Sequence, residues 1–103
     1  MPYKILQINL RFNVSSAELV EEFGTAATHI SAVPGLKWKI FCMNEERSEG
    51  AGIYLFEDDS ALKSYLEGPI IAGMKDKKAF SDITMKTFDV AEEATAITRG
   101  PIE

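Results

Sequence analysis

Cysteine and histidine are nearly absent from this chain, whose 103 residues include one of each, Cys42 and His29. With a single cysteine no disulfide can form within the chain, so a secreted disulfide scaffold is excluded. The usual zinc sites take several histidine and cysteine ligands, and two such residues are too few. We therefore expect no metal site.

Long apolar runs are also missing. No stretch approaches the roughly 18 apolar residues that a membrane-spanning helix needs. The N-terminus, Met1 to Lys4 followed by alternating apolar residues, lacks the basic region and apolar stretch of a signal peptide. We therefore expect a soluble, cytoplasmic protein that does not bind a membrane.

Basic residues are in the minority, with 11 Lys and Arg against 16 Asp and Glu, and the formal charge is −5. Nucleic-acid binding is not expected, because it normally needs a clustered basic face. The hydrophobic fraction of 46% is typical of a globular protein. We expect residues 1–103 to form one domain, with 91–103 as a loose or partner-bound C-terminal tail.

Apolar periodicity predicts a strand over residues 3–12, where Leu6, Ile8 and Leu10 alternate with polar residues. Ser15 or Ser16 can cap a helix that runs to about residue 32. The other predicted elements are strands at 36–43, 50–57 and 80–90, a helix after the cap signal Asp58-Asp59-Ser60, and a short helical turn over 69–78.

This order, β-α-β-β-α-β, predicts an α+β, ferredoxin-like fold with a four-stranded antiparallel sheet and both helices on one face. The sheet is apolar on both faces. In the second strand, Leu36, Trp38, Ile40 and Cys42 are predicted to share one face, with Phe41 and Met43 on the other. Because helices cover only one face, the simplest cover for the other is a second copy of the chain, in a two-fold homodimer.

Nucleotide and nucleophile motifs are not evident. There is no G-x-G-x-x-G, and Gly50-Ala51-Gly52 within a strand indicates a bulge or a close backbone approach. His29, slightly off the apolar stripe of its helix, is interpreted as a helix-flank residue, with a general base as the alternative. Cys42 is interpreted as a small buried hydrophobe, with a nucleophile as the alternative.

The face of the sheet away from the helices is the remaining candidate site. If Leu6, Ile8 and Leu10 face the helices, the polar residues between them face the other way. A pocket for a small apolar or aromatic molecule is predicted there, lined by Gln7, Asn9, Arg11, Trp38, Tyr54, Thr84 and Lys86. The alternative is that these side chains only fill the dimer interface.

Four segments together resemble the YdhR-like mono-oxygenase family, which belongs to the dimeric α/β-barrel superfamily. They are Pro34-Gly35-Leu36-Lys37-Trp38-Lys39, Gly50-Ala51-Gly52-Ile53-Tyr54-Leu55-Phe56, Ala61 with Tyr65-Leu66, and Phe88-Asp89-Val90. The chain departs from the family pattern at Ala51, often glycine, and Phe41, often tryptophan.

The resemblance implies a homodimer with a pocket in each subunit. It also implies oxygenation of a small aromatic or quinol-like substrate without flavin, haem or metal, so no cofactor is expected. Trp38 and Tyr54 match motif positions as pocket aromatics, while Asn9 and Arg11 are predicted from their facing alone. Tyr54 or Arg11 would hold a substrate oxygen, Asn9 would orient it, and Trp38 would stack on the ring.

Two further hypotheses stay open at this point. The chain could be a non-catalytic dimer that binds or senses a small apolar metabolite. It could also be a structural dimer whose sheet faces fill each other completely.

Overall fold

The computed structural model describes residues 2–102, and its elements up to residue 89 follow the predicted order. They are β1 (Lys4–Phe12), α1 (Ser16–Ile30), β2 (Leu36–Asn44), β3 (Glu49–Phe56), α2 (Asp59–Leu66), α3 (Pro69–Lys75), β4 (Phe80–Asp89) and α4 (Glu92–Ile97). The strands form one antiparallel sheet in the order β2-β3-β1-β4. The predicted ferredoxin-like α+β fold is confirmed.

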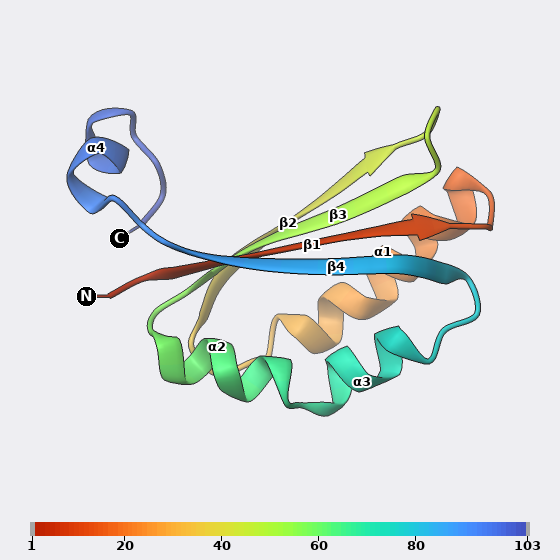
Figure 1. The fold of residues 1–103 in the computed structure, drawn as a ribbon, viewed down its shortest axis with the longest axis horizontal. Helices are drawn as coiled ribbons and strands as arrows, with labels where there is room; N and C mark the ends of the chain where they lie inside the picture. Colours follow the sequence, from red (N-terminus) through yellow and green to blue (C-terminus); the bar gives the residue numbers. More distant parts are fainter. Residues whose placement is uncertain (1, 103) are drawn as a thin grey trace.

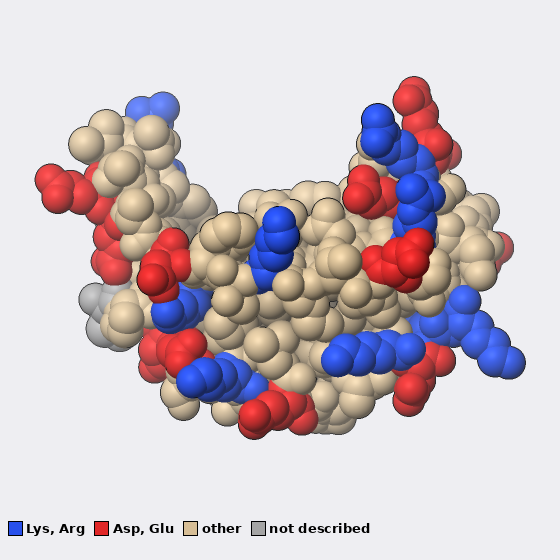
Figure 2. Space-filling model, in the orientation of Figure 1, with Lys and Arg blue, Asp and Glu red and all other residues tan. Residues whose placement is uncertain are grey.

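The two faces of the sheet have different neighbours (Figure 1). Helices α1, α2 and α3 lie along one face, which we call the helix face. The opposite face, which we call the free face, carries α4 and the C-terminal segment at one end only. The β2–β3 hairpin rises at the other end, so that the molecule is hollowed between the two raised ends (Figure 2).

The core lies between the helix face and the helices. Alternate residues of β1 are buried there, as the period-two pattern predicts: Leu6, Ile8, Leu10 and Phe12. They pack in two clusters with buried residues of β3 and the helices, which are Leu19, Ile30, Tyr54, Phe56, Leu62, Tyr65 and Ile71. Burial of each large side chain stabilises the fold by roughly 1.5–3 kcal/mol.

Both predicted helix caps are present. The Ser15 side chain accepts a hydrogen bond from the Glu18 backbone N–H at 3.1 Å, at the start of α1. The Asp58 carboxylate accepts one from the Ala61 N–H at 2.8 Å, at the start of α2. Each cap satisfies an N–H group that a helix start leaves unpaired.

A β-bulge in β2 corrects one predicted face. Leu36 pairs with Phe56 but Trp38 pairs with Leu55, so the register shifts by one residue between them. A one-residue shift reverses the face of every following side chain. Leu36 therefore packs on the helix-face core, whereas Trp38 lies on the free face, and the prediction that they share a face was wrong.

The C-terminal segment carries a short helix and contacts the sheet. The helix is α4, and the chain around Pro101 returns to the sheet. The Trp38 indole N–H donates a hydrogen bond of 2.7 Å to the Pro101 carbonyl. The segment therefore closes one end of the free face beside Trp38.

Gly35 has a backbone conformation that the turn between α1 and β2 requires. Its φ of +80° lies in the left-handed region, and a Cβ added there would overlap the Ala61 Cβ. We expect Gly35→Ala to lower the free energy of unfolding by about 1–3 kcal/mol in urea denaturation.

Gly24→Ala is the matched control. Gly24 is helical and a Cβ there meets nothing within 4 Å, so this variant should gain about 0.5–1 kcal/mol. Equal effects of the two substitutions would contradict the role assigned to Gly35.

Candidate functional site

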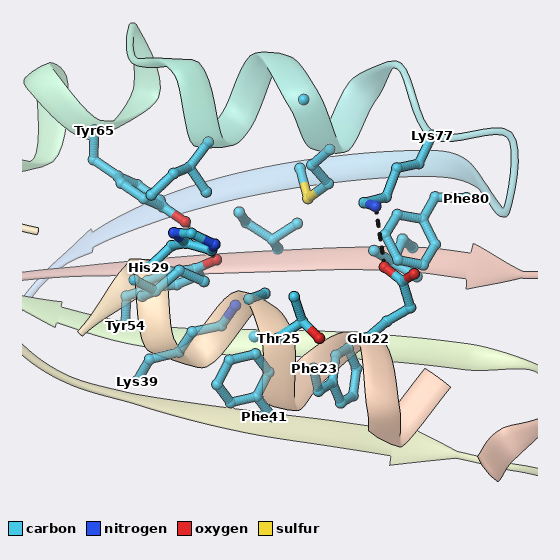
Figure 3. A pocket seen from close by; sticks show the side chains of 18 of the residues that line it. Glu22, Phe23, Thr25, His29, Lys39, Phe41, Tyr54, Tyr65, Lys77 and Phe80 are labelled. Atoms are coloured by element: carbon cyan, nitrogen blue, oxygen red, sulfur yellow. Dashed lines mark hydrogen bonds and ion pairs between the residues drawn. The ribbon is translucent and has the colours of Figure 1, made fainter. Parts of the chain in front are cut away.

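A cavity of about 400 Å³ lies between the helix face of the sheet and helices α1 and α3 (Figure 3). This volume is in the range of sites for small organic molecules. Its walls are mainly apolar or aromatic, formed by Ile8, Leu10, Phe23, Ala26, Ile30, Phe41, Ala51, Gly52, Tyr54, Tyr65, Pro69, Ile70, Gly73, Met74 and Phe80. We call it the helix-face pocket.

The location of this pocket corrects the predicted one. Side chains on paired strands share a face, and Tyr54 of β3 pairs with Leu6 of β1. Since Leu6 faces the helices, Tyr54 does too, and it lines the helix-face pocket. The prediction that Tyr54 shares the other face with Asn9 and Arg11 was wrong.

The other three predicted site residues lie on the free face. Asn9 accepts a hydrogen bond of 3.1 Å from the Gln7 side-chain amide, and Arg11 lies 3.8 Å from the Asp82 carboxylate in an exposed ion pair. Trp38 contacts the C-terminal segment. None of the three lines the helix-face pocket, and their catalytic roles stay predictions.

Two tyrosines line the end of the pocket beside α2. The Tyr65 hydroxyl donates a hydrogen bond of 3.0 Å to the Tyr54 hydroxyl, and both rings are buried. Burial raises the pKa of both phenols above the ordinary value, in Tyr54 with a further contribution from Tyr65. Both groups are therefore protonated at neutral pH, and since the two hydroxyls share one hydrogen bond, one O–H of the pair is left to donate to a ligand.

Lys39 brings a cation into this aromatic wall. Its Nζ lies 3.9 Å from the ring centroid of Phe41 and 4.4 Å from that of Tyr54. Burial disfavours the charged amine and lowers the pKa of Lys39 to about 8. In the described part of the chain, no carboxylate lies within ion-pair distance of it.

Gly52 makes the space that Lys39 occupies. A Cβ at Gly52 would lie 2.7 Å from Lys39 Cε and 3.1 Å from Tyr54 Cε1. The close approach predicted at the Gly50-Ala51-Gly52 segment is therefore made by a side chain of the neighbouring strand, because Gly52 pairs with Phe41 beside Lys39. Any larger residue at position 52 would displace the amine.

Polar groups border the pocket on the helix side. Glu22 of α1 forms an ion pair of 3.0 Å with Lys77, which follows α3. Figure 3 shows this pair at the end of the pocket away from Tyr65. His29 is exposed on α1 and lines the pocket, as a residue on the flank of a helix can.

Sequence reasoning missed Lys39, Phe41 and Tyr65 as pocket residues. A lysine within an alternating strand is usually solvated, so nothing local marks Lys39 as half-buried. The signal that could have found it is pairing: if Tyr54 is placed opposite Leu6, the strand register also turns Lys39 and Phe41 toward the helices.

Two classes of site find no support in residues 2–102. No three His, Cys, Asp or Glu side chains gather there in a group that could hold a metal ion. In the same residues, no helix has the length and apolar character to cross a membrane.

Comparison with known proteins places the fold. A family model described as "Putative mono-oxygenase ydhR" matches residues 5–101. NE2512 of Nitrosomonas europaea, a protein of unknown function, superposes with a TM-score of 0.73 at 18% identity, over 88% of this chain and 91% of its own. No curated protein matches the chain.

Two further structural neighbours have described activities. SnoaB of Streptomyces nogalater, a cofactor-independent oxygenase, has a TM-score of 0.72 at 15% identity, covering 87% of this chain and 94% of its own. MhuD of Mycobacterium tuberculosis, a heme-degrader, has a TM-score of 0.65 at 18% identity, covering 84% and 95%. At these identities the likeness establishes the fold.

The partial burial of Lys39 leads to a stability prediction. Lys39→Met keeps an unbranched apolar arm and removes a desolvated charge that lacks a carboxylate partner. At pH 7 we expect the variant to gain roughly 1–3 kcal/mol in free energy of unfolding. Urea denaturation at fixed protein concentration measures this, with the exposed Lys37→Met as control.

The gain should depend on pH in a defined direction. Between pH 8 and 10.5 the folded wild type has lost the Lys39 proton while the unfolded chain still binds it, so wild-type stability rises relative to the variant. The advantage of Lys39→Met should therefore shrink from pH 8 to pH 10. A difference that stays constant over this range would contradict the assignment.

Proposed function

This chain belongs to the ydhR mono-oxygenase family, and we propose that it is a cofactor-independent mono-oxygenase for a small aromatic or quinol-like substrate bound in the helix-face pocket. The resemblance predicted from the sequence is confirmed at the level of family and fold. The observation that carries the proposal is the aromatic-walled cavity between the sheet and α1 and α3.

Such a cavity suits a reaction in which the substrate supplies the electrons. In an anthrone, for example, a methylene group loses two hydrogens and gains one atom of dioxygen, while the second oxygen atom leaves as water. The substrate thus provides all four electrons. The protein has to exclude water, hold the ring and stabilise charge on the substrate oxygen as it develops.

Tyr54 is placed to interact with a substrate oxygen. Its ring forms part of the pocket wall, and its hydroxyl belongs to the pair with Tyr65, in which one O–H is not used in the shared hydrogen bond. The raised pKa keeps the phenol protonated, so it acts as a hydrogen-bond donor and not as a base. This role agrees with the prediction that Tyr54 holds a substrate oxygen, now within the helix-face pocket.

The free face supports a homodimer as part of the same proposal. Ile40 and Phe88 on this face are 50% and 46% exposed, and the half-buried Ile5 and Ile53 lie between their strands. A second copy packed on this hollow would remove these side chains from water and enclose Asn9 and Trp38.

A non-catalytic binding protein is the second candidate. It is favoured by the state of the two pocket phenols, which burial holds protonated so that neither serves as a base. The same pocket would then sequester or sense its ligand without turnover.

Oxygen consumption distinguishes these two functions. We expect the wild type to accelerate oxygen uptake with one or more members of a panel of quinols and anthrones, with no loss of rate after treatment with a metal chelator. Tyr54→Phe removes one donor to the developing oxyanion and should lower the rate about tenfold or more. Tyr3→Phe, outside the pocket, is the control.

The oxygenase proposal fails if no substrate in the panel is consumed faster than in buffer. Tight binding of the same compounds without oxygen uptake would establish the binding protein in its place.

The dimer has a test of its own. Ile40→Glu places a charge in the proposed interface, where an unpaired buried charge is costly. We expect the dissociation constant of the dimer in analytical ultracentrifugation to rise at least about tenfold.

Val20→Glu is the matched control, because Val20 is 55% exposed but lies on α1. The proposed interface is wrong if Val20→Glu dissociates the dimer and Ile40→Glu does not, or if the wild type is monomeric.

A further inference from the structure

We propose that the ligand of the helix-face pocket is a planar aromatic acid whose carboxylate pairs with the Lys39 amine. The inference rests on the proposed function only in taking this pocket as the ligand site. It specifies a substrate class that the oxygenase proposal leaves open, namely one with a permanent negative charge.

The position of Lys39 is fixed by its neighbours. Its alkyl arm passes over Gly52, where even a Cβ would overlap it. The Phe41 and Tyr54 rings contact the ammonium group at 3.9 and 4.4 Å from their centroids. Because these contacts hold the amine against the pocket wall, a ligand in the cavity meets it in one defined place.

The charge of Lys39 is not neutralised within the described chain. The carboxylate that lines the same pocket, Glu22, pairs with Lys77 at 3.0 Å, and Figure 3 shows this pair toward the other end of the pocket from Lys39. Aromatic faces attract a cation but provide less stabilisation than a carboxylate does. A ligand anion would supply the missing partner.

A carboxylate fits this position better than a phenol does. An ordinary carboxyl group is ionised at neutral pH, whereas an ordinary phenol, with a pKa near 10, is not. A carboxylate can also accept two hydrogen bonds, one from the Lys39 ammonium and one from the O–H that the Tyr54–Tyr65 pair leaves free. The apolar walls, including Phe23 and Met74, would enclose the rings.

The test uses two probes of nearly equal shape, 2-naphthoate and 2-naphthamide, which differ in charge. Isothermal titration calorimetry at pH 7 should give wild-type affinity at least about tenfold higher for naphthoate. In Lys39→Met the ratio should fall to within about twofold, while Lys37→Met, two residues earlier on β2 and exposed, should keep it. Circular dichroism confirms that each variant is folded.

A second measurement follows the protonation of the Lys39 amine when the ligand binds. The other titratable groups that line the pocket are Glu22, His29, Tyr54, Tyr65 and Lys77. At pH 8 the free amine of Lys39 is about half protonated, and pairing with naphthoate should draw in about half a proton. Titrations in buffers of different ionisation enthalpy measure this uptake, which should vanish in Lys39→Met and persist in the exposed Lys37→Met.

The possible outcomes distinguish failure of the aromatic-acid inference from failure of the proposed function. Equal binding of the two probes, or a naphthoate preference that survives Lys39→Met, overturns the aromatic-acid inference but leaves the pocket as a ligand site. If neither probe binds at millimolar concentration, the assignment of the pocket as a ligand site and the aromatic-acid inference are both wrong. Naphthoate preference without oxygen uptake from any quinol or anthrone, carboxylated members included, sustains the inference and rejects the oxygenase.

Discussion

The structure depends on the burial of one face of the central strand β1. Once Leu6, Ile8 and Leu10 pack beneath the helices, strand geometry sends Gln7 and Asn9 to the opposite face. Because paired residues on neighbouring strands share a face, the orientation of β1 also determines which side chains of those strands face the helices. The helix-face pocket and the free face therefore both follow from the packing of one face of β1. A change in strand register would alter the residues of both faces at once.

The order of elements and both caps could be predicted because their signals are local. Period-two alternation, Ser15 and Asp58 each act within a few residues. The facing of Trp38 and Tyr54 depends on longer-range facts. A bulge after Leu36 reverses the facing of the β2 side chains that follow it. The face on which Tyr54 lies follows only from its pairing with Leu6. The family resemblance placed these aromatics in motifs but did not say which side of the sheet they occupy.

The pocket combines features that oppose stability with features that suit binding. Gly52 has no side chain to pack within its strand, and the Lys39 side chain occupies the space that this leaves. The charge of Lys39 is disfavoured by burial there. Around them, Tyr54, Tyr65 and Phe56 form a closely packed aromatic group with ring centroids 5.2 to 5.9 Å apart. A rigid aromatic support can hold a polar group in place that a softer wall would release into solvent.

The C-terminal segment is attached to the sheet through a main-chain atom. Trp38 donates to the carbonyl of Pro101, and every amino acid provides such a carbonyl. Substitutions in the segment can therefore accumulate during evolution without loss of the contact. An insertion or deletion between α4 and Pro101 would instead move the acceptor away from the indole. In this family of chains, selection at this end of the sheet should act on the length of the segment more than on its composition.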